Sequence, residues 1–219
     1  WVQENAPHIN ISRAPRNTYW TWDGTNTEFE KAERKFYTEE FGPGQECANE
    51  RYRKNGHCER CKTVDDIYKD KQRKPEEVIL QIGDREDNVN PEDFSSCVAD
   101  YIRAMQDGPE KIGYLKILTV AIHLDEEVPH AHLTRCWINK DKWGYSREGL
   151  NGALKLGGFE LPDPKKPEGR FNNRKMTFDK YSRQIWVGIC QKHGFDVDTE
   201  PMINPRVHKK KVDYIYGKL

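Results

Sequence analysis

Three stretches of the chain repeat apolar residues every three or four positions, the spacing of an amphipathic helix. The first begins at Asn26-Thr27, and we expect Gly42-Pro43-Gly44 to end it. The second begins at Asn90-Pro91 and runs to Gln106, and the third follows Thr177, which we expect to cap it. The apolar positions are Phe29, Ala32, Phe36, Tyr37 and Phe41, then Phe94, Cys97, Val98, Tyr101, Ile102 and Met105, then Phe178, Tyr181, Ile185, Trp186, Ile189 and Cys190.

Other apolar runs have the length of strands. Residues 78–83 read as a buried strand, and 115–124 and 130–138 as a hairpin joined by a five-residue connection. Ser146 is expected to cap a short helix that buries Leu150, Ala153 and Leu154. Strands and helices do not alternate regularly, so we predict an α+β fold, an antiparallel sheet flanked by helices.

The chain length favours a single domain. We expect residues 1–200 to form it, with a charged helical insertion at about 42–75. A Pro- and Lys-rich loop is expected at 161–173. Residues 201–219 read as a basic tail or linker.

Charge and composition exclude several functions. Of the 219 residues, 35% are hydrophobic and 33% charged, and 36 Lys and Arg balance 36 Asp and Glu. No net field attracts a polyanion, so binding of nucleic acid has to come from local patches. No apolar run approaches the ~18 residues of a membrane span, and no signal peptide is visible, so a membrane is not an expected partner.

Cysteines indicate the compartment. A charged chain of this size does not need disulfides, so six scattered cysteines favour the reducing cytoplasm. Cys47, Cys58 and Cys61 with His57 could hold a structural zinc ion, but one Cys-x-x-Cys pair is weak evidence, and free thiols are the other interpretation.

The densest chemistry lies at the predicted hairpin. His130 and His132 alternate on one strand and therefore share a face, and His123 ends the preceding strand. Folding the hairpin brings the three imidazoles together on the central strand pair. Three neutral imidazoles with open coordination positions are typical of a metal site that acts on a substrate.

These residues resemble a known family. The run His-Leu-Asp-Glu-x-x-Pro-His-x-His at 123–132 is similar to the third motif of the MobV-type relaxases, the plasmid mobilisation and recombination proteins of the Pre/Mob family. Ile9-Asn10-Ile11-Ser12-Arg13 followed by Asn17 resembles another segment of that family, and the stretches at 172–177 and 192–195 are also similar. The resemblance covers residues 5–200 and implies an HUH endonuclease-like fold.

The resemblance implies an enzyme that nicks one DNA strand at an origin of transfer or recombination site, through a covalent protein–DNA intermediate. DNA, single-stranded or as a hairpin origin region, would be the partner, with other mobilisation proteins as further partners. His123, His130 and His132 would hold a divalent ion, Mn²⁺ or Mg²⁺ in the family, and imidazoles alone favour Mn²⁺ over Mg²⁺. Glu126 matches the motif glutamate and would orient the nucleophile or a ligand, whereas Asp125 and Glu127 read as surface charges.

The sequence differs from the family pattern at the nucleophile. The family's His-Asn-x-Arg segment is missing from this sequence, and by counting back from Arg13 it would fall at or before Trp1. His8 and Tyr19 are the substitutes within the chain, because relaxases use His or Tyr. A homologue that has lost nicking is the remaining alternative.

Local charge predicts the DNA contacts. Seven basic and two acidic residues lie between Lys165 and Arg183, and Arg174 and Lys175 stand out in this surplus. Arg13, Arg16 and Asn17 would hold the strand near the metal, with Trp20 and Trp22 stacking on bases.

Two other functions share these features. A metal-dependent phosphodiesterase or hydrolase would use the same triad without a covalent DNA step. A non-catalytic DNA-binding homologue would keep the site without using it.

Overall fold

A computed structural model of the chain describes residues 10, 12–26, 28–84, 87, 89–107 and 114–199. The elements are η1 (Ala14–Arg16), β1 (Thr18–Thr21), α2 (Phe29–Lys54), η2 (Cys58–Arg60), α3 (Val64–Lys69), β2 (Glu76–Gln81), α4 (Pro91–Asp107), β3 (Leu115–His123), β4 (His130–Lys140), β5 (Ser146–Glu148), α5 (Leu150–Leu156) and α6 (Arg174–Lys192).

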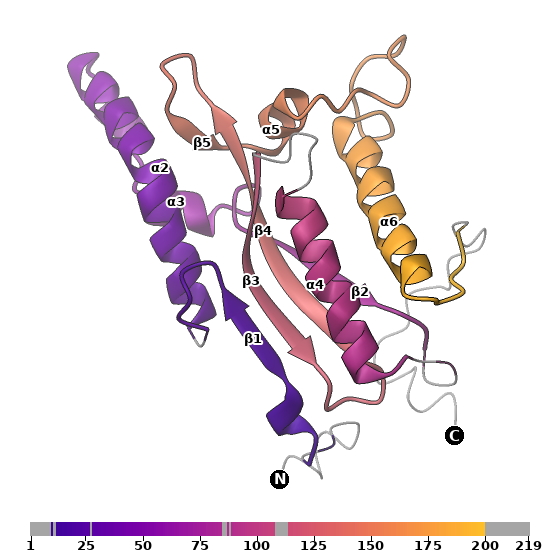
Figure 1. The fold of residues 1–219 in the computed structure, drawn as a ribbon. Coiled ribbons are helices and arrows are strands. Elements are labelled where there is room, and N and C mark those ends of the chain that lie inside the picture. Colours follow the sequence, from indigo (N-terminus) through magenta and orange to yellow (C-terminus); the bar gives the residue numbers. More distant parts are fainter. Residues whose placement is uncertain are drawn as a thin grey trace, which may run out of the picture.

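The strands form one five-stranded antiparallel sheet in the order β1-β3-β4-β2, with β5 paired to the far end of β4. The predicted hairpin is its centre. Figure 1 shows helices on both sides of the sheet, which confirms the α+β prediction. Among the described residues, no helix is long and apolar enough to span a membrane.

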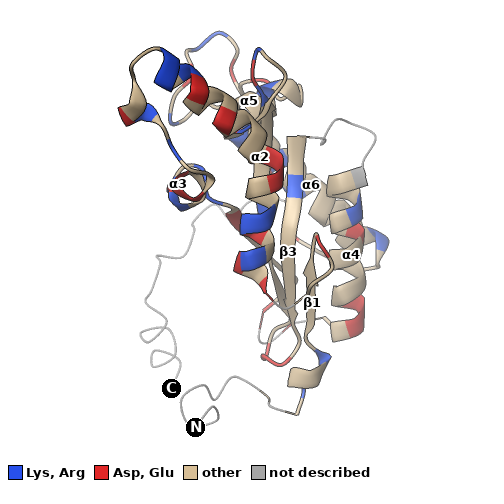
Figure 2. Ribbon diagram, turned by 90° about the vertical axis from the view of Figure 1, so that its left-hand side faces the viewer, with Lys and Arg blue, Asp and Glu red and all other residues tan. Residues whose placement is uncertain are grey.

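Two separate cores lie on the two faces of the sheet. On one face, α4, α5 and α6 bury the larger cluster, which includes Phe94, Tyr101, Leu133, Leu154 and Phe178. On the other face, α2 and α3 bury a smaller cluster. Its members are Phe36, Tyr37, Phe41, Ile67, Leu118 and Cys136. Figure 2 shows α2 and α3 on one side of β3 and α4 and α6 on the other.

The smaller core covers only part of its face. Side chains alternate along a strand, so His130, His132 and Thr134 point to the same side as the buried Cys136. The helices cover the sheet around Cys136 and leave the histidine end partly exposed. The fold therefore presents the triad on an open stretch of sheet.

The prediction that Gly42-Pro43-Gly44 ends the first helix was wrong. Helix α2 continues through Pro43 to Lys54. Tertiary packing outweighs the propensity of the three residues: Phe41 is buried before them, and Gly44 is buried where the β4–β5 hairpin crosses the helix. A Cβ at Gly44 would lie 2.8 Å from the carbonyl oxygen of Ser146, so the glycine permits this contact.

Three local expectations also need correction. Strand β2 is an edge strand, not a buried one, and Ile79 is 58% exposed because it lies beside His132 on the stretch of sheet that the helices leave uncovered. Ser146 lies in β5 and hydrogen-bonds to Glu40, while Gly149 begins α5. Asn173, whose side chain accepts from the Met176 amide, caps α6 in place of Thr177.

Candidate metal centre

The structure brings the three predicted histidines together. His123 pairs directly with His130 across β3 and β4, and His132 follows on the same face. The ring centroids lie 5.1 Å apart for His123 and His130, 5.5 Å for His123 and His132, and 5.2 Å for His130 and His132. One ring nitrogen from each lies within 4.8 Å of the others, and within the described ranges no other group of three His, Cys, Asp or Glu side chains meets in this way.

The Nδ1 atoms of two of the rings contact oxygen atoms. His130 Nδ1 lies 3.0 Å from the Val128 carbonyl oxygen, and His132 Nδ1 lies 2.9 Å from Glu77 Oε1. An Nδ1–H that donates to such an oxygen leaves the lone pair on Nε2, the form that binds a metal. The donor set therefore fits a cation held by imidazole nitrogens.

Burial lowers the pKa of His123, and the neighbouring His130 and His132 lower it further, against Asp125 and Glu126. A lowered pKa keeps the ring neutral near pH 7, as a metal ligand must be. The His123 and His132 side chains are still 29% and 36% exposed. The site is thus shielded enough to favour neutral rings and open enough to admit a substrate.

Asp125 is not the surface charge that the sequence suggested. It is 8% exposed, and its Oδ1 is buried without a hydrogen bond. That oxygen lies 4.0 Å from Nδ1 of His123, which is too far for a hydrogen bond but close enough for the carboxylate to act on the ring electrostatically. Glu126, the motif glutamate, is half-buried, and its charge raises the pKa of His123.

The sequence analysis missed Glu77. It lies on β2, 55 residues before His132, so nothing in the histidine motif points to it. The strand alternation contains the signal, because Val78 and Leu80 face the larger core and Glu77 must then face the triad. Strand β2 pairs with β4, and this pairing brings Glu77 next to His132.

Of the two nucleophile candidates within the chain, one can be located. Tyr19 on β1 contacts His123 edge-to-face, with ring centroids 6.4 Å apart, and is 46% exposed. His8 lies outside the described residues. Tyr19 and Ile79 thus flank the histidines on the two outer strands of the same face.

Of the predicted DNA-contacting residues near the triad, two line a surface depression and the others make contacts within the protein. Arg13 and Arg16 line a shallow depression of about 410 Å³ next to Glu127 and Pro129, and Arg16 pairs with Glu92. Asn17 accepts a hydrogen bond from the Leu124 amide at 2.8 Å, which joins β1 to the end of β3. Both tryptophans are packing residues: Trp20 lies against the larger core, and Trp22 packs on Phe36 and donates to the Ala32 carbonyl.

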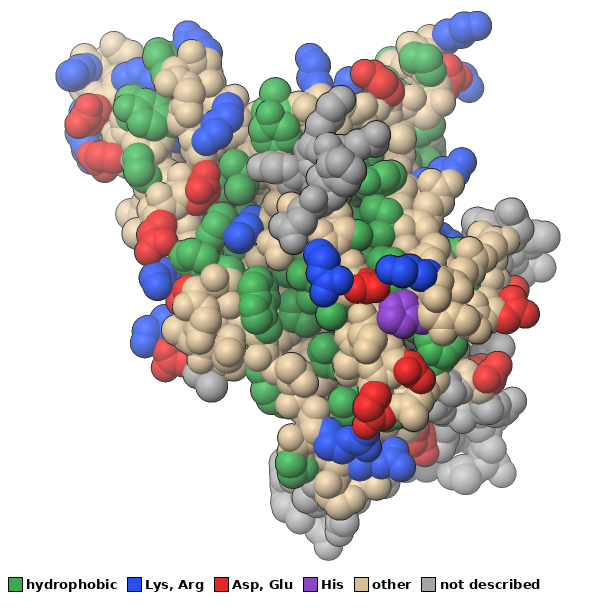
Figure 3. Space-filling view, in the orientation of Figure 1, with side chains coloured by type: hydrophobic (Ala, Val, Ile, Leu, Met, Phe, Trp, Pro, Cys, Tyr) green, Lys and Arg blue, Asp and Glu red, His purple; other side chains and the backbone are tan. Residues whose placement is uncertain are grey.

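Arg174 and Lys175 lie at the start of α6, on the face opposite the triad. Arg174 pairs with Glu168 at 2.9 Å, and Lys175 pairs with Glu76 and Asp179 at 2.8 and 2.5 Å. Figure 3 shows this face of the molecule, where basic and acidic side chains are interspersed. The local surplus of positive charge in the sequence is therefore partly neutralised in the fold.

The six cysteines are free thiols. Cys47, Cys58, Cys61 and His57 do not come together as a group of ligands. The Cys61 thiol instead donates to the Asn49 carbonyl. Of the two interpretations of this segment, the described residues favour free thiols.

Of the comparisons with known proteins, the one with solved structures found a similar protein. The sequence matches no family model, and no curated protein matches it. Among solved structures, the chain is similar to the MobM relaxase domain (MOBV; Mob_Pre) bound to plasmid pMV158 oriT DNA, a crystal structure with bound Mn. The TM-score is 0.56 at 16% sequence identity, over 98% of this chain and 85% of that one. The fold is therefore similar to that of the MobM relaxase domain, as the resemblance implied.

Proposed function

We propose that this chain is a metal-dependent DNA relaxase that nicks one strand at an origin of transfer or recombination site of a plasmid or other mobile element. One observation carries the proposal: three imidazoles converge on an open sheet face, and the Nδ1 atoms of two of them contact oxygen atoms. The fold supports it, because the similar MobM domain is described as bound to oriT DNA and to Mn.

His123, His130 and His132 would hold the divalent ion, with Mn²⁺ a better match than Mg²⁺ for imidazole ligands. The ion would supply Lewis-acid polarisation of a phosphate oxygen. The chain's own residues orient this site: Glu77 and the Val128 carbonyl fix two rings, and the buried Asp125 carboxylate lies 4.0 Å from the third.

The chemical step is a transesterification. The attacking side chain forms a bond to phosphorus, the bond from phosphorus to the 3′ oxygen breaks, and the 3′ oxygen takes a proton from water. The protein keeps the 5′ phosphate, and the attacking group gives its own proton to a nearby base. We propose Tyr19 as the attacking group because it is exposed beside His123, and Glu126 as the residue that orients it; His8 is the second candidate.

DNA binding, domain limits and location complete the proposal. Arg13, Arg16 and Asn17 would contact the strand near the triad, and Arg174 and Lys175 a more distant part of the DNA. The catalytic domain would span 1–200 with the insertion at 42–75, followed by the tail at 201–219. Six free thiols support a reducing cytoplasm as the working compartment.

The test is incubation with Mn²⁺ and supercoiled plasmid carrying candidate origins, followed by denaturing electrophoresis and detection of DNA-linked protein. A covalent adduct that disappears with EDTA is the expected result. Nicked DNA without an adduct would indicate a hydrolase, and binding without cleavage a DNA-binding homologue. Either of these two results overturns the proposal.

A further inference from the structure

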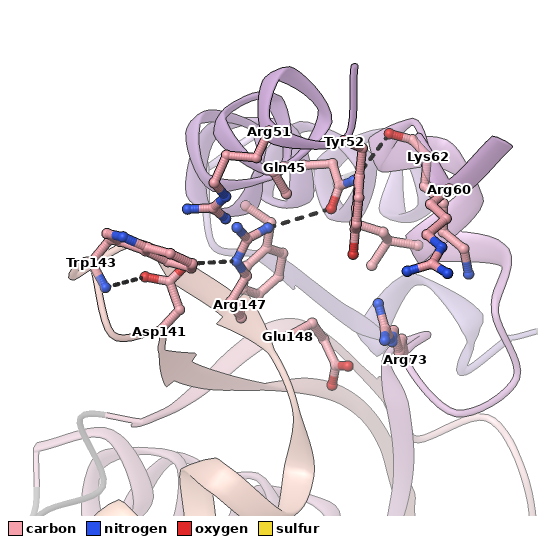
Figure 4. A pocket seen from close by; sticks show the side chains of 13 residues that line it. Gln45, Arg51, Tyr52, Arg60, Lys62, Arg73, Asp141, Trp143, Arg147 and Glu148 are labelled. Carbon is pink, nitrogen blue, oxygen red and sulfur yellow. Dashed lines mark hydrogen bonds and ion pairs between the residues drawn. The ribbon is translucent and has the colours of Figure 1, made fainter. Parts of the chain in front are cut away.

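A second cavity lies on the same side of the sheet as the triad, at the other end of β4. Its volume is about 370 Å³, and its walls come from the C-terminal half of α2, the segment from η2 to Arg73, and the β4–β5 hairpin. Figure 4 shows the side chains that line it. None of the chemistry proposed for the triad uses this cavity.

Five cationic side chains line the cavity, against two carboxyl groups: Arg51, Arg60, Lys62, Arg73 and Arg147, with Asp141 and Glu148. Asp141 is already occupied, since its Oδ2 accepts from Arg147 Nε at 3.1 Å. Burial raises the pKa of Glu148 to about 8, so this carboxyl adds little negative charge at neutral pH. The cavity is a concentrated positive region in a chain of zero net charge.

The basic side chains surround a common space. In Figure 4, Arg60 lies above Arg73 on one side of the cavity, and the Tyr52 ring lies beside them. Arg73 forms no ion pair among the described residues, and Arg60 has an exposed pair with Glu59 at 3.6 Å. Arg51 stacks on the Trp143 ring at 3.4 Å. Trp143 is 53% exposed, so its ring and the Arg51 guanidinium lie together at the edge of the cavity.

Hydrogen bonds fix the backbone of two walls of the cavity. Asn49 Nδ2 donates to the Lys62 carbonyl at 2.8 Å, and Asn49 Oδ1 accepts from the Lys62 amide at 3.1 Å, which fixes the segment that carries Arg60 and Lys62. Asp141 Oδ1 accepts from the Trp143 amide at 2.9 Å and shapes the hairpin wall. Basic groups positioned before a ligand arrives bind it with less loss of entropy.

The path from the triad to the cavity has the length of a short piece of DNA. Ile138 pairs with Glu148 at the cavity and lies six residues after His132, on the same face of β4. At roughly 3.4 Å per residue the separation is about 20 Å. A strand bound at the triad therefore reaches the cavity within the same bound segment.

We propose that this cavity binds the phosphodiester backbone of the DNA about 20 Å from the scissile phosphate, with Arg60 and Arg73 contacting phosphate oxygens. The assignment rests on the proposed function, since it takes DNA as the ligand. Arginine suits this role because its guanidinium donates two parallel hydrogen bonds to a phosphate.

The experiment measures binding of a fluorescein-labelled single-stranded 30-mer by anisotropy, at several salt concentrations, for the full chain. The variant R60A/R73A changes two exposed side chains. The matched control K54A/K71A removes the same charge from exposed positions outside the cavity. Circular dichroism melting verifies that each variant is folded.

We expect R60A/R73A to bind DNA about tenfold more weakly and to flatten the log–log salt slope by about 1.4, the value for two phosphate contacts on a single strand. R60K/R73K, which keeps the charge, should retain most of the slope. Equal affinity and slope for R60A/R73A and the control would overturn the assignment.

Mn²⁺ affinity and adduct formation separate this inference from the proposed function. R60A/R73A should bind Mn²⁺ like the unmodified chain, because the cavity is remote from the triad. If the unmodified chain forms no adduct while R60A/R73A still weakens DNA binding, the proposed nicking fails and the cavity assignment stands. If the adduct forms and R60A/R73A binds DNA like its control, the proposed nicking stands and the cavity assignment fails.

Discussion

In the triad, the contact that each Nδ1 atom makes decides whether the ring can bind a metal through Nε2. Each ring has two nitrogens, and an acceptor near Nδ1 selects the tautomer that leaves Nε2 free. His132 depends on Glu77 for this, through a single 2.9 Å contact from the edge strand β2. Glu77 is therefore a positioning residue, not a ligand.

Replacing Glu77 with Ala should weaken Mn²⁺ binding by about 10–100-fold, the usual effect of losing such a partner. The three ligands remain, so one ion should still bind. Isothermal titration calorimetry measures the affinity, with E46A, an exposed glutamate on α2, as the control. Unchanged affinity in E77A would show that the contact does not orient His132.

Tyr19 is tested by removing one oxygen atom. In Y19F the ring keeps its edge contacts with His123 and Phe29, so fold and Mn²⁺ affinity should be unaffected. The covalent adduct should disappear, because phenylalanine has no hydroxyl to attack phosphorus. An adduct that persists in Y19F would assign the attack to another group, and H8A would then be the next variant.

At the scale of elements, α2 shows where sequence rules give way to packing. Glycine and proline predict a helix end, yet α2 runs through both because the β4–β5 hairpin lies against it at Gly44. Lysine and arginine alternate with acidic residues along the exposed side of this helix (Figure 2). The C-terminal half of α2 and the β4–β5 hairpin also supply walls of the basic cavity.

Two neighbouring glycines give opposite predictions. G44A should lower the free energy of unfolding by about 1–3 kcal/mol, because its Cβ would meet the Ser146 carbonyl oxygen, which is backbone and cannot swing away. G42A meets nothing closer than 4.0 Å and should raise stability by up to about 1 kcal/mol through helix propensity. Urea denaturation measures both, and a G44A variant as stable as G42A would refute the packing argument.

The elements that were predicted correctly are those whose pattern is local. The hairpin of β3 and β4, helix α4 and the meeting of the three histidines follow from alternation and helical spacing within short windows. What depends on distant partners could not be predicted in this way. The edge position of β2, the burial of Asp125 and the contact of Glu77 all depend on strand order, which no local pattern encodes.

At the scale of the whole molecule, charge is organised by face. The chain has no net charge, so DNA has to be attracted by patches. The sequence indicated Arg174 and Lys175, while the structure adds a cavity on the triad side whose cations have fewer acidic partners. The two patches lie on opposite faces of the sheet.

The double variant R174A/K175A tests the sequence-based patch. If these residues contact phosphates, it should weaken DNA binding and reduce the salt slope by up to about 1.4. The ion pairs to Glu168 and Glu76 should make the loss smaller than for R60A/R73A in the same assay. An unaltered slope would remove this patch from the DNA interface.

The central claim is that three imidazoles on the β3–β4 pair bind one divalent cation, and calorimetric titration with Mn²⁺ tests it most directly. The unmodified chain should bind one ion, and H130A should lose at least about 100-fold in affinity while it keeps its circular dichroism spectrum. H57A, which removes an exposed histidine elsewhere, should bind like the unmodified chain. Equal Mn²⁺ affinity in H130A and H57A would contradict the claim.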